Sequence, residues 1–253
     1  MGYRDLAYRL YEHRLEASLA RKPIPKHIGV MCDGNRRWAR LEGHADVSTG
    51  HRAGADKIFE LLKWCRETGV EVVTLWLLST DNLTRSKDEL EKLLPIIEDT
   101  VIGLVEENWH VKPVGALDLL PDHTARVLKS AAEATIDNPG LVVNVAVGYG
   151  GRQEIADAVR SLLIEQASRG ATIEEVAETI DVEAIAEHLY TAGQPDPDLV
   201  IRTSGEQRIG GFLLWQSTHS EFYFCDAFWP AFRKVDFLRA LRSYSERNRR
   251  FGA

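Results

Sequence analysis

The stretch HIGVMCDGNRRWAR, residues 27–40, passes from an apolar run directly into a group of polar and charged residues. The run IGVMC (28–32) is typical of a buried strand, and Asp33, Gly34 and Asn35 follow it without a spacer, ahead of two arginines. An ordinary surface loop has no need of a carboxylate, a glycine and fixed cations together. A site that holds a phosphate and a metal ion does, so the stretch predicts a strand that ends in such a site.

Apolar runs alternate with helical patterns along the rest of the chain. Further buried strands are predicted at residues 70–79, 111–117, 141–150 and 198–206, with short late elements at FLLWQ (212–216) and FYFCD (222–226). Helices are predicted at residues 3–21, 58–65, 88–109, 121–136, 152–168 and 236–249. This alternation predicts a single-domain α/β fold with a mostly parallel central sheet that is flanked by helices on both faces.

The sequence shows no internal repeat, low-complexity tract or Pro/Gly/Ser-rich linker. We therefore expect one main domain over residues 27–253, preceded by an N-terminal helix and lead-in over residues 1–26. In that first helix, leucines recur at helical spacing among charged residues. The mixed charge favours packing against the core or against a dimer partner over lying on a bilayer.

Composition and charge argue against several classes of protein. The formal net charge of −7 over 253 residues speaks against a nucleic-acid-binding protein, which usually carries a basic surplus. No run reaches the roughly 18 apolar residues of a transmembrane helix, and the charged start of the chain speaks against a secretory signal. The three cysteines form no CxxC pair, so we expect a cytoplasmic protein whose membrane contact is at most peripheral, at the inner face.

Polar residues and arginines follow four of the predicted strands, in the segments CDGNRRW, LLSTDNLTR, VGYGGR and IRTSGEQR. Ligands of open parallel sheets bind at the carboxyl ends of the strands, so these segments are expected to meet. The planar fork of arginine suits a diphosphate, and this points to an anionic ligand. The arginines concerned are Arg36, Arg37, Arg85, Arg152, Arg202 and Arg208.

The best-known phosphate and metal motifs are absent. The sequence has no GxxxxGK[ST] loop, no GxGxxG after the first strand, no HEXXH and no clustered Cys/His spacing. The metal ligands expected here are hard oxygens, such as the carboxylates of Asp33 and Glu221. Such ligands favour Mg²⁺ that bridges phosphate oxygens.

Five longer motifs occur in order along the chain: DGNRRWAR, GHRAG (50–54), LLSTDNLTRSKDE, GYGGR and DLVIRTSGEQRIGGFLLWQSTHSEFYF. Together they resemble the cis-prenyltransferases, the undecaprenyl diphosphate synthase-like family, from about His27 to Gly252. The resemblance implies that residues 27–253 are the catalytic domain of a homodimer. It also implies Mg²⁺-dependent, head-to-tail addition of isopentenyl diphosphate to an allylic diphosphate, with a new cis double bond.

The resemblance places the allylic diphosphate at the first two motifs. Asp33 matches an aspartate that binds Mg²⁺ and diphosphate and is needed for the chemistry; read alone, it could equally be a turn-forming residue before glycine. Gly34 lets the backbone approach the diphosphate. A lone histidine is more often structural, so the role of His51 depends on the resemblance. The other residues assigned to this substrate are Asn35, Arg36, Arg37 and Trp38.

The resemblance places the second substrate and the reacting carbons at later motifs. Ser79 and Asn82 match residues near the reacting carbons, although STDNL also reads as a helix cap or turn. The residues assigned to binding at this side, chiefly of isopentenyl diphosphate, are Arg85, Glu89, Arg202, Arg208 and Gly210.

Three further residues are assigned to a site that two subunits share. Glu221 matches a glutamate that helps to hold Mg²⁺, and the resemblance allows it to do so across the dimer. Arg250 and Gly252 match a terminal Arg-x-Gly that completes the site of the partner subunit. Without the resemblance, the end of the chain reads as a charged tail.

Several positions depart from the common pattern of the family. The loop ADVSTG (45–50) lacks the usual arginine for the allylic diphosphate, and Gly210 stands where a phosphate-binding serine is common. These changes weaken individual assignments and can signal an altered choice of substrate. The other positions where the residue differs from the one common in the family are Leu83, Ser86, Val147 and Gln207.

Leu77 bears on the length of the product. Long-chain members usually carry alanine two residues before the serine, and the short-chain Z,E-farnesyl diphosphate synthases carry a bulky residue. A leucine there adds bulk to the tunnel for the growing chain, and protein interiors have no spare volume. We therefore expect a short product, Z,E-farnesyl diphosphate made from geranyl diphosphate; the alternative is that Leu77 only packs the core.

Other functions remain open from the sequence. Within the family, the chain could be a long-chain undecaprenyl or decaprenyl diphosphate synthase that supplies a cell-wall lipid carrier, or a branching, head-to-middle relative. A non-catalytic partner subunit is a further alternative, but Asp33, Asn35 and Arg37 are present, and silent partners tend to have lost them. A generic nucleotide-binding protein would need a phosphate loop that the sequence lacks.

Overall fold

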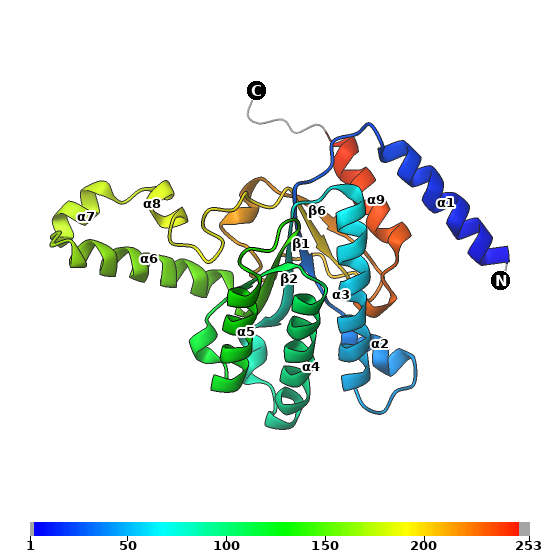
Figure 1. Cartoon of the computed structure of the whole chain (residues 1–253), viewed down its shortest axis with the longest axis horizontal. Coiled ribbons are helices and arrows are strands. Elements are labelled where there is room, and N and C mark those ends of the chain that lie inside the picture. The colour runs from blue at the N-terminus through cyan, green and yellow to red at the C-terminus, as the bar shows by residue number, and fades with distance from the viewer. Residues whose placement is uncertain (1–2, 248–253) are drawn as a thin grey trace.

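The computed structural model describes residues 3–247, which form one six-stranded parallel sheet surrounded by helices (Figure 1). The strands lie in the order β3-β4-β2-β1-β5-β6, and all pairings between them are parallel. The α/β fold predicted from the alternating pattern is confirmed. The strands are β1 (His27–Met31), β2 (Val72–Ser79), β3 (His110–Val114), β4 (Val142–Tyr149), β5 (Leu199–Arg202) and β6 (Glu221–Phe224).

Nine α-helices connect and flank these strands within the described part of the chain. Their ends follow local rules: Gly69 closes α3 with a left-handed φ of 83°, and Thr172 and Glu175 form a capping box at α7. The helices are α1 (Tyr3–Leu19), α2 (Asn35–Leu41), α3 (Ser48–Thr68), α4 (Lys87–Glu106), α5 (Asp122–Thr135), α6 (Gly151–Ser168), α7 (Ile173–Thr179), α8 (Val182–Ala186) and α9 (Lys234–Glu246).

Helices α3, α4, α5 and α9 cover one face of the sheet and enclose the main core. Alternation along β1 separates the two faces, because Ile28 and Val30 point into this core whereas Met31 belongs to a second cluster. Phe212 and Leu213, from the irregular segment between β5 and β6, cover the second face. At Gly29 an added Cβ would lie only 3.0 Å from the Phe212 ring, so a side chain there would displace this cover.

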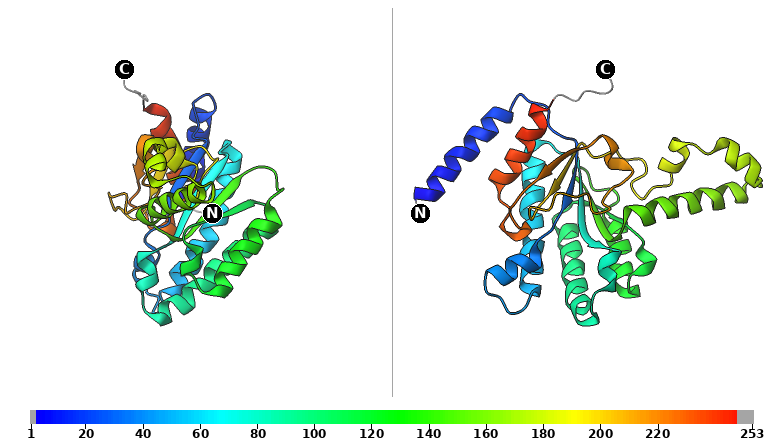
Figure 2. Two further views of the ribbon diagram at one scale, coloured as in Figure 1. Left: turned by 90° about the vertical axis from the view of Figure 1, so that its left-hand side faces the viewer. Right: turned by 180° about the vertical axis from the view of Figure 1, so that it is seen from behind.

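Two helical extensions leave the central body at opposite ends (Figures 1 and 2). One is the arm formed by α6, α7 and α8, and the other is α1. Leu15 and Leu19 of α1 are buried, and Arg239 of α9 lies over the ring of Tyr11 at 5.1 Å. The first helix therefore packs on α9. In the described residues no helix combines the length and the apolar character needed to cross a membrane.

Several element boundaries differ from those predicted. Helix α3 begins at Ser48, ten residues before the predicted start, because the GHRAG motif is itself helical. The predicted strands at 111–117 and 198–206 are longer than β3 and β5. A short 3-10 helix, Leu117–Leu119, follows β3, and the residues after β5 turn toward the site. Of the two short late elements, FYFCD overlaps β6, whereas FLLWQ (212–216) is an irregular segment whose Phe212 and Leu213 cover the second face of the sheet.

Candidate active site

A cavity of about 570 Å³ opens at the carboxyl ends of β1, β2 and β5. Met31, Trp76 and Arg202 are neighbours in the register of these strands, so the polar segments that follow each strand meet there. The expectation that these strand ends converge is thereby confirmed for three of the four. Among the residues assigned from the sequence, those that line the cavity are Asp33, Gly34, Asn35, Arg36, Arg37, His51, Leu77, Ser79, Asn82, Arg85, Arg202, Arg208 and Gly210.

The turn after β1 is fixed by its contacts with the end of β5. The backbone N–H of Asp33 donates to Thr203 Oγ1 at 3.0 Å, and the Thr203 hydroxyl lies 2.8 Å from the Asp33 carbonyl oxygen. Gly34 has a φ of 103°, and a Cβ there would lie 2.7 Å from the ring of Phe228. Only glycine fits both constraints, so the glycine of the DG pair is a requirement of this turn.

Helix α2 packs closely on α3 through the GHRAG motif. A Cβ at Gly50 would overlap the backbone oxygen of Asn35, and one at Gly54 would overlap its side-chain oxygen. The Asn35 amide nitrogen donates to the Cys32 carbonyl oxygen at 3.2 Å, while its buried Oδ1 has no hydrogen-bond partner in the described structure. The two glycines therefore hold Asn35 at the edge of the cavity.

The carboxylate of Asp33 lies between the side chains of Arg37 and Arg202, which are far apart in the sequence. Its Oδ2 is 3.0 Å from Arg202 Nη2, and its Oδ1 is 3.7 Å from Arg37 Nη2. Arg202 is only 5% exposed, and its buried Nε has no hydrogen-bond partner in the described structure. A buried guanidinium with one carboxylate partner retains unused donors for an anion.

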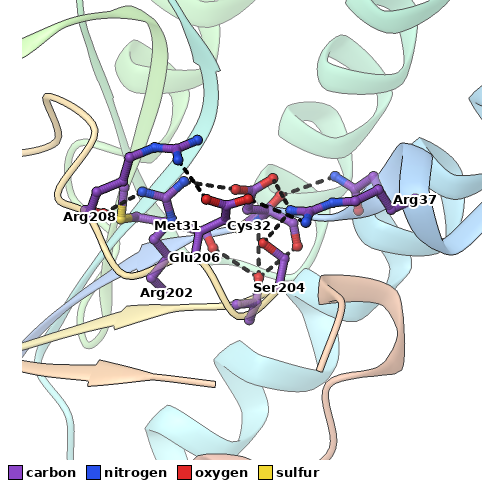
Figure 3. Close-up of polar contacts among 10 residues, drawn as sticks. Met31, Cys32, Arg37, Arg202, Ser204, Glu206 and Arg208 are labelled. Carbon is purple, nitrogen blue, oxygen red and sulfur yellow. Dashed lines mark hydrogen bonds and ion pairs between the residues drawn. The ribbon is translucent and has the colours of Figure 1, made fainter. Parts of the chain in front are cut away.

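Glu206 forms a second carboxylate bridge across the cavity (Figure 3). Its Oε1 lies 3.4 Å from Arg37 Nη1 and its Oε2 lies 2.6 Å from Arg208 Nη1. Figure 3 shows Arg37 on one side of Glu206 and Ser204, and Arg202 with Arg208 on the other. The cavity thus has arginine side chains on both sides of the carboxylates of Asp33 and Glu206.

Another cationic group lies near the start of α4. Glu89 Oε1 pairs with Arg85 Nη1 at 2.9 Å and with Arg36 Nη1 at 3.3 Å. Burial, and secondly the nearby charge of Arg36, lower the pKa of Arg85. Glu89 does not line the cavity, so its observed contacts are with the arginines that do.

His51 lies beside this group with its ring largely buried. Burial, followed by the charge of Arg85, lowers the pKa of His51 to about 4. Its Nε2 is buried and has no hydrogen-bond partner in the described structure. At neutral pH the imidazole is therefore uncharged, and one ring nitrogen is available to a ligand in the cavity.

Ser79 and Asn82 lie together at the end of β2. The backbone N–H of Asn82 donates to Ser79 Oγ at 3.1 Å, so the turn-forming interpretation of STDNL is consistent with the structure. Both residues also line the cavity. The ordinary alternation of a strand places Trp76 on one face of the sheet and Leu77 on the other. The register of β2 against β4 then shifts between Trp76 and Ser79, and Leu78 packs against the same core as Leu77.

Some assigned residues lie outside this cavity. Trp38 packs against His44, with 5.8 Å between the ring centroids. Glu221 begins β6 in register with Leu199, at the opposite end of the sheet from the cavity, and it pairs with Arg247. Arg250 and Gly252 lie outside the described residues. Glu221 is therefore too far from the cavity of its own subunit to hold Mg²⁺ there.

Several cavity residues received no role from the sequence. Arg40 follows Arg36 and Arg37 at helical spacing, and this spacing could have indicated it once the short helix α2 was recognised. Glu206 gave no such signal, because only the folded chain brings it between Arg37 and Arg208. The other unassigned lining residues are Met31, Cys32, Trp76, Leu78 and Asp81.

The residues present are compatible with Mg²⁺ only if a substrate supplies most of the ligands. The described residues contain no group of three or more His, Cys, Asp or Glu side chains that could hold a metal ion. Mg²⁺ is usually held by one or two carboxylates together with waters and substrate phosphates. Asp33 fits this pattern, since its side chain is 39% exposed and lines the cavity among arginines that suit phosphate.

A small apolar pocket of about 30 Å³ lies behind Leu77. Helices α3 and α4 form most of its wall, and Trp229 closes one side. The residues shared with the main cavity are Cys32, Asn35, His51 and Leu77. The remaining lining residues are Gly54, Ala55, Ile58, Leu93, Ile96, Ile97, Thr100 and Trp229.

Comparisons with known proteins agree with this geometry. The chain is 69% identical over 245 residues to a (2Z,6E)-farnesyl diphosphate synthase of Thermobifida fusca (strain YX), which covers 97% of this chain and 96% of that protein. It is 58% identical over 249 residues to a short-chain Z-isoprenyl diphosphate synthase of Mycobacterium bovis, with 97% and 95% covered.

A solved structure is also similar. The crystal structure of lavandulyl diphosphate synthase from Lavandula x intermedia, in complex with dimethylallyl diphosphate, has a TM-score of 0.84 and 33% sequence identity. The match covers 91% of this chain and 99% of that one. Residues 31–252 match the model of the family described as putative undecaprenyl diphosphate synthase. The chain thus belongs to the undecaprenyl diphosphate synthase family, and it is a cis-prenyltransferase.

Proposed function

We propose that this protein is a short-chain cis-prenyltransferase that condenses isopentenyl diphosphate with geranyl diphosphate. The product would be Z,E-farnesyl diphosphate, with release of diphosphate. The observation that carries this proposal is the 30 Å³ apolar pocket behind Leu77. A cavity of this size holds roughly one or two water molecules, so little room is left for further isoprene units.

The names of similar proteins support the same product class. The matching proteins from Thermobifida fusca, Mycolicibacterium smegmatis and Mycobacterium tuberculosis are named (2Z,6E)-farnesyl diphosphate synthases. These names favour a short product over the long-chain alternative, an undecaprenyl or decaprenyl diphosphate synthase that supplies a cell-wall lipid carrier. Because Asp33, Asn35 and Arg37 all line the cavity, a non-catalytic partner subunit is also disfavoured.

In this proposal the first site holds the allylic diphosphate. The start of α2 presents backbone N–H groups, and Arg37 adds a charged fork beside Asp33. Asp33 would hold Mg²⁺, which when bound supplies positive charge to the departing diphosphate. The prenyl tail would extend past His51 toward Leu77 and the apolar walls of the small pocket. The positive charge would develop at the opposite end of the substrate, on the carbon next to the departing diphosphate.

The second site holds isopentenyl diphosphate on the other side of Asp33 and Glu206. Arg202 and Arg208 are the proposed diphosphate ligands, and Arg202 has unused donors for this purpose. With both diphosphates fixed, the reacting carbons would lie near Ser79 and Asn82. Positioning of this kind supplies a large part of the rate enhancement in reactions between two substrates.

We also propose that the enzyme works as a homodimer. The exposed apolar residues of the arm and of the edge strand β6, including Ile164, Ile173, Val182 and Phe224, support a surface for a second copy. Within such a dimer, Glu221, Arg250 and Gly252 would act at the cavity of the partner. A cytoplasmic location, with membrane contact at most peripheral, completes the proposal and is supported by three free cysteines.

Product analysis tests the proposed function. Purified protein with Mg²⁺ and labelled isopentenyl diphosphate would be incubated separately with dimethylallyl, geranyl and farnesyl diphosphates, and the dephosphorylated products would be sized. We expect a single C15 product from geranyl diphosphate. A ladder of long products would retain the enzyme class and reject the short-chain proposal, and no product from wild type and Asp33→Ala alike would favour a partner subunit.

A further inference from the structure

The segment between β5 and β6 that carries Arg208 and Gly210 has an unusual backbone. We call residues 203–215 the arginine loop. Gly210, Gly211 and Leu213 all have positive φ, and that of Leu213 is 45°. A buried leucine in the left-handed region is strained, and such a conformation persists only when surrounding contacts enforce it.

Tyr149, the last residue of β4, makes one of those contacts. The backbone N–H of Leu213 donates to the Tyr149 hydroxyl oxygen at 3.1 Å. The same hydroxyl donates its proton to Glu154 Oε2 at 2.5 Å. Tyr149, Glu154 and Leu213 are all fully buried, so this chain of hydrogen bonds runs in a water-free environment where a missing partner is costly.

Glu154 also fixes the chain just beyond the arginine loop. Its Oε1 accepts hydrogen bonds from Gln216 Nε2 at 2.9 Å and from the backbone N–H of Tyr190 at 3.1 Å. The backbone N–H of Gly151 donates to the Gly211 carbonyl oxygen at 2.8 Å. The turn from β4 into α6 therefore holds the arginine loop at Gly211 and Leu213, and the chain just beyond the loop at Gln216.

These contacts reach the cavity through the loop itself. Phe212 stacks on Trp76 with 5.2 Å between ring centroids, and the carbonyl oxygen of Arg208 accepts from the guanidinium of Arg202. A shift at Leu213 would therefore move Phe212, Gly210 and the Arg208 backbone together. Neither Tyr149 nor Glu154 lines the main cavity.

We propose that Tyr149 and Glu154 are positioning residues that fix the arginine loop so that Arg202 and Arg208 hold isopentenyl diphosphate. The assignment of this substrate to these two arginines rests on the proposed function. The positioning role itself rests on the hydrogen bonds from Leu213 and Gln216 to the β4–α6 turn. It predicts a defect confined to one of the two substrates.

The structure offers a matched control for the test. Tyr190 donates from its hydroxyl to Asp157 Oδ2 at 2.5 Å, which is the same kind of bond to a carboxylate one turn further along α6. Among the described residues, the Tyr190 hydroxyl makes no hydrogen bond to the arginine loop. Tyr149→Phe and Tyr190→Phe therefore each remove one tyrosine-to-carboxylate bond, and only the first frees the N–H of Leu213.

The experiment compares the binding of each substrate to the intact protein. For Tyr149→Phe we expect the KM and the calorimetric Kd of isopentenyl diphosphate to rise about tenfold, the usual effect of one buried hydrogen bond, with the allylic KM within twofold of wild type. For Tyr190→Phe both KM values should stay within twofold. Equal losses for both substrates, or an unchanged Kd for isopentenyl diphosphate, would overturn the proposal.

A second pair covers the case in which Tyr149→Phe fails to fold. Glu154→Gln keeps the side-chain volume and weakens the bonds to Tyr149 and Gln216, with Asp157→Asn as its control; the same selective rise is expected, and an equal effect of the two would refute the proposal. Failure of the proposed function is separable. A wild-type enzyme that binds isopentenyl diphosphate but makes no C15 product would reject that function, while the Kd comparison would still decide the role of Tyr149.

Discussion

Asp33 and Arg202 form an ion pair, with 3.0 Å between Oδ2 and Nη2, although 169 residues separate them in the chain. The pairing of β1 with β5 creates it, because Met31 and Arg202 are register partners and Asp33 follows two residues later. Arg202 also donates to the carbonyl oxygen of Arg208. One guanidinium thus connects the proposed metal ligand with the arginine loop.

Replacement of Arg202 by lysine tests this connection. A lysine ammonium is a single point charge and cannot donate in two fixed directions as the guanidinium does. We expect Arg202→Lys to lower kcat/KM for isopentenyl diphosphate by about 10²-fold, in the range found when one preorganised donor is removed. The measurement is steady-state kinetics with each substrate varied.

The control for this variant is Arg160→Lys. Arg160 is exposed on α6 and pairs with Asp157. The Arg160→Lys variant should keep wild-type kinetics, because exposed ion pairs contribute little to stability. Wild-type kinetics for Arg202→Lys as well would contradict the proposed role of Arg202 in binding isopentenyl diphosphate. They would also show that donation in two fixed directions is not needed.

Leu77→Ala tests the proposed control of product length. Removal of the leucine side chain joins the small apolar pocket to the main cavity, and we expect products longer than C15 from geranyl diphosphate. The measurement is the size of the dephosphorylated products. Leu75→Ala is the control, since Leu75 is fully buried on the same strand but lines neither cavity.

The two leucine variants separate the effect on length from the effect on stability. Leu75→Ala should cost about 2–5 kcal/mol of unfolding free energy, as large-to-small core substitutions do, and leave the product at C15. If Leu77→Ala also yields only C15, the walls from α3, α4 and Trp229 set the length without it.

The sequence identified most of the strands of the sheet and most of the residues that line the cavity. The runs at 28–32, 70–79 and 141–150 were correctly predicted as strands, because strands buried on both faces are continuously apolar. FLLWQ has the same composition, but it covers the sheet in a strained irregular conformation, and composition does not separate these two ways of burying apolar residues. The contacts of Glu206 and the position of Glu221 at the far end of the sheet depend on strand order, which no local pattern contains.

His51 gives a prediction for the pH dependence of stability. Its pKa is lowered to about 4, chiefly by burial, whereas in the unfolded chain it should be near 6.5. The unfolded state therefore binds the proton more readily, and stability is lost as the pH falls from about 6.5 toward 4. The shift corresponds to at most about 3 kcal/mol for this one group.

Comparison of wild type with His51→Gln isolates this contribution. Arg85 and Arg36 oppose protonation of the ring, while Glu89 and Asp46 favour it, and all four remain in the variant. We expect the variant to lose less unfolding free energy than wild type between pH 6.5 and 4 in urea titrations. Parallel pH profiles for the two proteins would show that the ring titrates normally in the folded state.

Gly34 and Gly43 form a natural pair for testing the turn that follows β1. Both have positive φ, 103° and 80°, so alanine introduces left-handed strain of about 1–2 kcal/mol at either position. Nothing lies within 4 Å of a Cβ at Gly43, whereas a Cβ at Gly34 would lie 2.7 Å from the Phe228 ring and 3.0 Å from Ser204 Cβ. We expect Gly34→Ala to destabilise the protein more than Gly43→Ala in urea unfolding. Because the clash displaces the start of α2, we also expect Gly34→Ala to lose kcat/KM, a loss that Gly43→Ala does not share. Equal effects of the two substitutions would mean that Gly34 is required only for its backbone conformation.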